Sequence, residues 1–187
     1  VGGDYPTHLD QFKLVSSKLD MGSDEKLEVA FEATKGGVKV VKTYRFTRGN
    51  YGIEVATTVT NEGAAPVKPQ IYYQISRDGG KPEGENSMYS TFTGPAVYSE
   101  EENFQKIQFS DIASKDASFV ESTDNGWVAM IQHHFVSAWI PNQGEARQNY
   151  VREVSKDLYA VGTLLPMKEI APGASETTTA ILYSGPQ

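Results

Sequence analysis

The sequence has no cysteine among its 187 residues, and this absence excludes several kinds of chemistry. Without cysteine the chain can form no disulfide bond, no thiolate nucleophile and no cysteine-ligated zinc or iron–sulfur centre. The absence does not fix the compartment, since many exported bacterial domains also lack cysteine. The composition, with 39% hydrophobic and 22% charged residues, is otherwise typical of a folded globular protein.

Basic residues are also fewer than acidic ones, 17 against 24, which gives the chain a formal net charge of -7. A nucleic-acid-binding protein needs a basic surface that neutralises phosphate groups. A domain that docks on anionic lipid head groups through a basic patch has the same need. The charge balance therefore argues against nucleic acid as a partner and against membrane docking of that kind.

No hydrophobic run is long enough to indicate a membrane span. The 20 residues 125–144 contain no Asp, Glu, Lys or Arg, but Gln132, His133 and Ser137 interrupt them. A spanning helix needs about 20 predominantly apolar residues, so we interpret this segment as buried β structure. The chain opens on Val1 without a signal-like segment, and we expect any targeting segment of the natural protein to lie outside it.

Alternation of apolar and polar residues is the dominant pattern, and it predicts β-strands rather than helices. Glycine-rich turns such as Lys35-Gly36-Gly37 separate the alternating runs. Short strands at this spacing indicate one large antiparallel β-sandwich with at most short helices, one of them expected at the start of 100–112. The expected strands cover residues 27–33, 38–47, 53–59, 67–75, 127–132, 135–140, 148–154, 158–164 and 176–183, with a weaker one at 12–19.

The longest loop signal covers residues 77–87, and it does not complete a catalytic motif. Loops of this length in compact domains are often functional, although a plain connection is the preferred interpretation. Gly79 and Gly84 have the spacing of a phosphate-binding loop, but Glu85-Asn86 follows where Lys and Ser or Thr are required. The sequence also has no GxGxxG and no GxSxG motif. We therefore predict no catalytic residue, no cofactor and no enzymatic activity.

The three histidines do not form a metal-binding pattern. His133 and His134 are adjacent, and neighbouring side chains of a strand point to opposite faces, so we interpret the pair as a hairpin corner with one ring exposed. In a tight turn the rings can approach each other, but no third ligand lies near them in sequence. The acidic segment 20–24 is too short and too poor in ligands for a calcium loop. We interpret it as a solvated turn and predict no metal site.

Tyrosine is abundant, with ten residues, and aromatic residues gather between positions 72 and 98. Tyrosine is enriched where one protein meets another, but it also pairs well across sheets, and the core interpretation is preferred for most of the cluster. Tyr72 and Tyr73 must face opposite sides of their strand, so at most one of them faces the core. A partner or cleft surface is predicted within 67–114, carried by Tyr72, Tyr73, Arg77, Tyr89, Phe92 and Tyr98.

Three segments carry a resemblance to a known family. The longest reads NGWVAMIQHHFVSAWIP at 125–141, and an earlier one reads KTYRFTRGNY at 42–51, followed by VTNEG at 59–63. The first resembles the signature strand pair of the periplasmic domains of YidC membrane protein insertases, and the second resembles that family's earlier hairpin. The third segment, SGP at 184–186, resembles the end of the domain before its linker to the membrane. The resemblance covers nearly the whole chain.

The resemblance implies both a fold and a role. YidC proteins insert and fold inner-membrane proteins, alone or beside the Sec translocon, and their Gram-negative members carry a β-supersandwich, similar to galactose mutarotases, between the first two transmembrane helices. Residues 1–187 would then be a single non-catalytic domain of a larger inner-membrane protein, at the periplasmic face of the bacterial inner membrane. The implied partners are Sec translocon components such as SecDF and nascent inner-membrane proteins, bound through a partner-contact or substrate-contact surface.

A sugar-active module is the alternative that the fold relationship suggests. Mutarotase-like enzymes use separated histidines and a carboxylate around a sugar cleft for acid–base chemistry. Here two of the histidines are adjacent, and His8 lies near the start of the chain. Because a fold does not establish an activity, a carbohydrate-binding or mutarotase-like function is kept as the second hypothesis.

Overall fold

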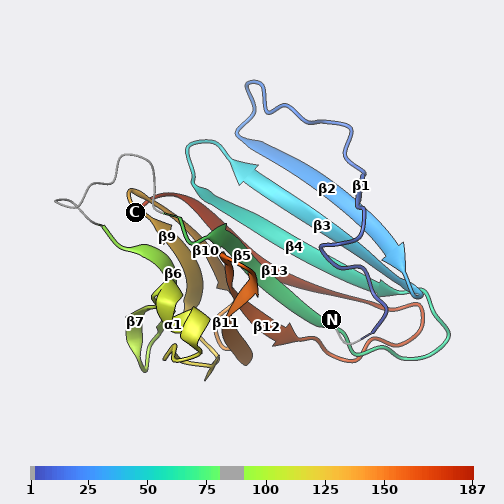
Figure 1. Ribbon diagram of the computed structural model, residues 1–187. Coiled ribbons are helices and arrows are strands. Elements are labelled where there is room, and N and C mark those ends of the chain that lie inside the picture. Colours follow the sequence, from blue (N-terminus) through green and yellow to red (C-terminus); the bar gives the residue numbers. More distant parts are fainter. Residues whose placement is uncertain (1–2, 81–90) are drawn as a thin grey trace. The chain divides into compact units, whose positions relative to one another are not determined.

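A computed structural model describes residues 3–80 and 91–187 (Figure 1). The chain divides into two compact units, the first made of Val1–Ile71 and Pro166–Ile181, the second of Tyr72–Leu165 and Leu182–Gln187. Both units consist of antiparallel strands, and one short helix occurs in the described part of the chain. The predicted all-β class is therefore confirmed, whereas the single domain stays a prediction. No helix in the described ranges is long and apolar enough to cross a membrane.

The first unit is a twisted sheet whose strands follow the predicted alternation. The neighbours lie in the order β1-β2-β3-β4-β13, and β2, β3 and β4 lie side by side in Figure 1. Strand β3 pairs with β2 over its whole length and with β4 from Val38 to Arg45, so that Val40 is opposite both Ala33 and Val59. Apolar residues of one strand thus meet apolar residues of the next on the same face. The bounds are β1 Lys13–Leu14, β2 Lys26–Lys35, β3 Val38–Thr47, β4 Gly52–Asn61 and β13 Ser175–Pro186, which continues into the second unit.

Lys42 is a polar exception on the apolar face of this sheet. It is opposite Phe31 of β2 and Thr57 of β4, and its amine lies 4.8 Å from the centre of the Phe12 ring. No ion pair reaches Lys42 within the described residues. Burial lowers the pKa of the Lys42 amine, because a charged group loses its hydration there.

We expect Lys42→Met to raise the thermal unfolding midpoint by roughly 2–4 °C, since methionine fills similar space without a charge. The penalty on the charged amine is fully present below its lowered pKa and falls as pH rises from that pKa toward the ordinary lysine pKa. The gain should therefore be largest near neutral pH and shrink as pH approaches the ordinary lysine value of 10.5. Lys39→Met is the matched control, because Lys39 lies on the other face of β3 and pairs with Glu32 at 2.9 Å. An equal gain in both variants would contradict the explanation by burial.

The second unit is a sandwich of two sheets. One sheet has the order β5-β12-β11-β8, and the other contains the end of β13 followed by β10-β9-β6-β7. Val97 and Val128 of the larger sheet pack with Tyr159 and Val161 of the smaller one in a common core. The bounds are β5 Gln70–Asp78, β6 Thr93–Ser99, β7 Asn103–Lys106, α1 Phe109–Ser114, β8 Ser122–Thr123, β9 Trp127–Gln132, β10 Phe135–Pro141, β11 Arg147–Ser155 and β12 Leu158–Pro166.

Several predicted elements need correction. The short helix covers Phe109–Ser114 and not the start of 100–112, because Glu100–Glu102 form the turn of a hairpin in which Phe104 pairs with Tyr98. The strand predicted for 67–75 begins at Gln70, directly after Pro69, which has no N–H to donate to a neighbouring strand. The weak strand at 12–19 is reduced to Lys13–Leu14. By contrast, the uncharged segment 125–144 forms the hairpin β9–β10, as predicted.

Candidate functional site

The residues predicted for a partner surface have different surroundings. Tyr73 is only 4% exposed, and its ring centre lies 4.7 Å from that of Trp139, so it belongs to the core of the second unit. Tyr72 is half-buried on the opposite side of β5, as the alternation of the strand requires. Arg77 lies near the end of β5 and lines a pocket. Tyr89 lies outside the described residues.

Phe92 and Tyr98 belong to a group of aromatic side chains that we call the aromatic surface. The ring of Tyr98 stacks on Trp127, with centres 5.6 Å apart and planes 14° apart, and Phe104 lies 5.7 Å from Trp127. The register explains this arrangement, because Tyr98 of β6 is opposite Phe104 of β7 on one side and Trp127 of β9 on the other. The aromatic surface consists of Phe92, Tyr98, Phe104, Lys106 and Trp127.

The aromatic surface is accessible, and its charges are mixed. Phe104 is 45% exposed, which is high for a phenylalanine. The amine of Lys106 lies 5.2 Å from the centre of Phe92 and 5.7 Å from that of Phe104, so it covers both rings as a cation. The exposed turn Glu100–Glu102 borders the same hairpin. Aromatic anchors with charges around them are typical of protein-binding surfaces.

Strand β7 also offers backbone groups. It is the last strand of its sheet in the described chain, so one side of it pairs with no other strand. The N–H of Ile107 donates to the carbonyl of Pro95 at 2.9 Å, and backbone direction alternates along an antiparallel strand. The N–H groups of Phe104 and Lys106 therefore point away from β6. An exposed edge of this kind can pair with an extended segment of another chain.

Gly126 allows Trp127 to lie directly opposite Tyr98 on the neighbouring strand. Its φ of +82° lies in the left-handed region, and a Cβ atom at this position would lie 1.8 Å from the carbonyl oxygen of Tyr98. Asn125 supports the same junction, because its side-chain oxygen accepts a hydrogen bond of 2.8 Å from the N–H of Glu100. The residues Asn125-Gly126-Trp127 thus connect β9 closely to the end of β6.

The adjacent histidines form the turn between β9 and β10. His134 is exposed and His133 half-buried, with ring centres 3.7 Å apart, so the predicted hairpin corner is confirmed. His133 has a φ of +52°, and its Nδ1 forms a hydrogen bond of 2.5 Å with the hydroxyl of Thr91. In the described ranges no group of three or more His, Asp or Glu side chains could hold a metal ion.

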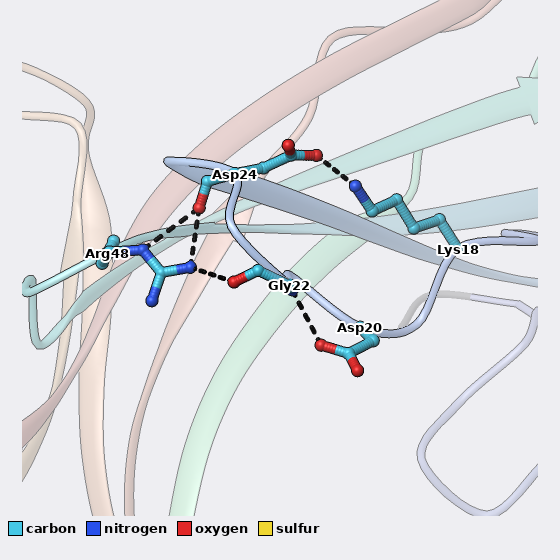
Figure 2. A network of polar contacts seen from close by, with 5 residues as sticks. All are labelled: Lys18, Asp20, Gly22, Asp24 and Arg48. Carbon is cyan, nitrogen blue, oxygen red and sulfur yellow. Dashed lines mark hydrogen bonds and ion pairs between the residues drawn. The ribbon is translucent and has the colours of Figure 1, made fainter.

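The acidic segment 20–24 is held by basic side chains (Figure 2). Asp24 pairs with Lys18, and this hydrogen bond and charge lower the pKa of the Asp24 carboxyl. Arg48 donates hydrogen bonds to the carbonyl oxygens of Gly22 and Asp24, and a carboxylate oxygen of Asp20 accepts one from the N–H of Gly22. The segment is therefore an exposed turn in the connection between β1 and β2.

The sequence alone does not single out Phe104 and Lys106 within the predicted region 67–114, and it does not assign Trp127 to a surface. The signal that could have found them is the register of three strands, since Tyr98, Phe104 and Trp127 are neighbours only after β6, β7 and β9 have paired. Neither β6 nor β7 was predicted as a strand. Gly94 and Pro95 obscure the pattern of β6, and β7 has only four residues.

The fold places the chain in a structural class. Among solved structures it is similar to a galactose mutarotase-like protein from Clostridium acetobutylicum, at 10% identity and a TM-score of 0.51 over 95% of this chain and 67% of the other. It is also similar to a galactose mutarotase related enzyme from Lactobacillus acidophilus, at 9% identity and a TM-score of 0.54 over 94% and 71%. These likenesses show the fold alone. The chain thus has a galactose mutarotase-like β-sandwich fold, with an exposed aromatic sheet edge.

The family follows from the sequence as a whole. The model of the YidC periplasmic domain matches residues 1–187, and the chain belongs to this family. It is 48% identical over 187 residues to a membrane protein insertase YidC from Cupriavidus necator, covering all of this chain and 34% of that protein. It is 47% identical over 186 residues to the insertase YidC of Bordetella pertussis, of which it covers 33%. The chain therefore spans about a third of the length of these curated relatives.

Proposed function

We propose that this chain serves a membrane protein insertase as a non-catalytic contact module at the periplasmic face of the inner membrane, and that the aromatic surface makes the contact. The observation that carries the proposal is the stacked group of Tyr98, Phe104 and Trp127 beside the open edge of β7. Support for the insertase comes from the family and from the name of its relatives. Components of the Sec translocon such as SecDF are the proposed partners, with nascent inner-membrane proteins as the alternative occupants.

The chemistry of the surface suits a partner with an extended apolar segment. The outward N–H groups of Phe104 and Lys106 can bind the carbonyls of an added strand, while the rings beside them can pack on its side chains. Aromatic residues dominate the binding energy of many interfaces because they bury a large area at a small cost in side-chain entropy. The predicted residues Phe92 and Tyr98 belong to this surface, and Tyr72 lies on another sheet.

A photo-crosslinking side chain at Phe104 tests the proposal, placed in an insertase that carries this domain and examined in native membranes. We expect it to capture a Sec translocon component or a nascent inner-membrane protein. Val154 is the matched control, because it lies in the same unit and is 46% exposed, against 45% for Phe104. We expect Phe104→Ser to weaken the interaction by about tenfold. Equal capture from both positions, or none from Phe104, would refute the contact role of this surface.

A further inference from the structure

A pocket of about 190 Å³ lies in the second unit, beside the β9–β10 hairpin, and none of its lining residues belongs to the aromatic surface. Its apolar wall is formed by Ile75, Met130, Phe135 and Val136, and its polar wall includes Arg77 and Ser137. An engineered protein cavity of roughly 150 Å³ takes up benzene. The pocket can therefore hold at least a group of that size.

Arg77 gives the pocket a positive charge. Its Nη2 donates to the carbonyl of Gly80 at 2.8 Å, whereas its Nη1 is buried and has no hydrogen-bond partner in the described chain. None of the ion pairs between described residues involves Arg77. Buried N–H donors in folded proteins nearly always have a partner, and the partner that suits a guanidinium best is a carboxylate or a phosphate.

The rest of the pocket is suited to hydrocarbon. Met130 is only 4% exposed and belongs to the core of the unit, so the inner end of the pocket meets the apolar interior. Phe135 is 64% exposed at the start of β10, an unusual exposure for a ring of this size. A ligand that contacts both the cation and these side chains must itself have a charged end and an apolar end.

We propose that the pocket binds a small anionic amphiphile, with its carboxylate or phosphate group on the guanidinium of Arg77 and its alkyl chain against Met130, Val136 and Phe135. A free fatty acid and a phospholipid both present this chemistry. The proposal is independent of the contact role of the aromatic surface, since the two sites share no residue.

Titration of the 187-residue chain with octanoate, octyl phosphate and octanol tests the proposal, with the methyl signal of Met130 in NMR spectra as the readout. We expect both anions to shift this signal and to bind at least about tenfold more tightly than octanol, because only they pair with Arg77. Arg77→Gln should abolish that preference. Arg152→Gln is the matched control, because Arg152 is an exposed arginine on β11 that does not line the pocket. Thermal unfolding of each variant verifies that it is folded.

A second variant, at Ser137, keeps the charge of Arg77 and fills the volume of the pocket. Ser137→Leu should fill the pocket and abolish binding of all three compounds while Arg77 is intact. Vesicles of phosphatidylglycerol and of phosphatidylcholine distinguish a phospholipid from a free amphiphile. Arg77-dependent binding to the anionic phosphatidylglycerol vesicles would identify a phospholipid as the ligand. Binding of the soluble anions alone would identify a free amphiphile. The proposal is overturned if octanol binds as tightly as octanoate, if Arg77→Gln or Ser137→Leu binds normally, or if the Met130 signal does not move.

Discussion

Replacing Gly126 by alanine is expected to lower the free energy of unfolding by about 2–5 kcal/mol. Gly126 has a φ of +82°, a conformation that costs an alanine about 1–2 kcal/mol. The new Cβ would also lie 1.8 Å from the carbonyl oxygen of Tyr98 and 2.7 Å from its carbonyl carbon. These are backbone atoms of a paired strand, so they cannot turn aside as a flexible side chain can, and overpacking of this kind costs roughly 1–3 kcal/mol.

Gly144→Ala separates the cost of the backbone conformation from the cost of the contact with Tyr98. Gly144 has a φ of +81°, nearly that of Gly126, but a Cβ there would meet nothing within 4 Å. We expect this variant to lose only the conformational part, about 1–2 kcal/mol. Urea unfolding monitored by tryptophan fluorescence measures both variants, and Trp127 beside Gly126 reports directly on the stack with Tyr98. Equal losses at the two glycines would show that the contact with Tyr98 contributes nothing.

Alternation was sufficient to predict most of the strands, because one face of each strand packs on a core. The pairing of β2 with β3, in which Phe31 is opposite Lys42 and Val29 opposite Tyr44, follows from the short turn at Lys35-Gly36-Gly37. Strand β6 escaped prediction because Gly94 and Pro95 are residues that usually interrupt strands. It forms nevertheless, since β7 and β9 pair with its two sides and Val97 packs into the core of the unit, fully buried.

The candidate sites were harder to predict than the fold, because each is assembled from strands that are distant in sequence. Phe104 and Trp127 meet only through their common neighbour Tyr98, and alternation alone cannot give the order of strands in a sheet. The pocket likewise combines Arg77 of β5 with Phe135 of β10. The resemblance of residues 125–141 identified the family correctly, but it indicated nothing about which side chains of the domain form a surface.

Arg147 is expected to be among the most important side chains for the stability of the second unit. Its Nε donates to the carbonyl of Glu145 at 3.1 Å, and its Nη2 donates to the carbonyls of Asp124 and Asn142 at 2.7 and 2.5 Å. The side chain thus holds the loop before β9 against the loop after β10. Arg147 is only 4% exposed, and loss of hydration lowers the pKa of its guanidinium, which nevertheless stays charged at any ordinary pH.

Arg147→Ala should therefore lower the free energy of unfolding by at least about 3 kcal/mol, because three carbonyls lose a charged donor that water cannot readily replace. Arg48 is the matched control, since it also makes three hydrogen bonds to backbone carbonyls, those of Gly22 and Asp24, but is exposed. Water can hydrate these carbonyls in Arg48→Ala, so the expected loss is below about 1 kcal/mol. Urea unfolding curves of the two variants measure the difference. If both lost the same free energy, the number of hydrogen bonds and not their burial would decide how much such an arginine stabilises the fold.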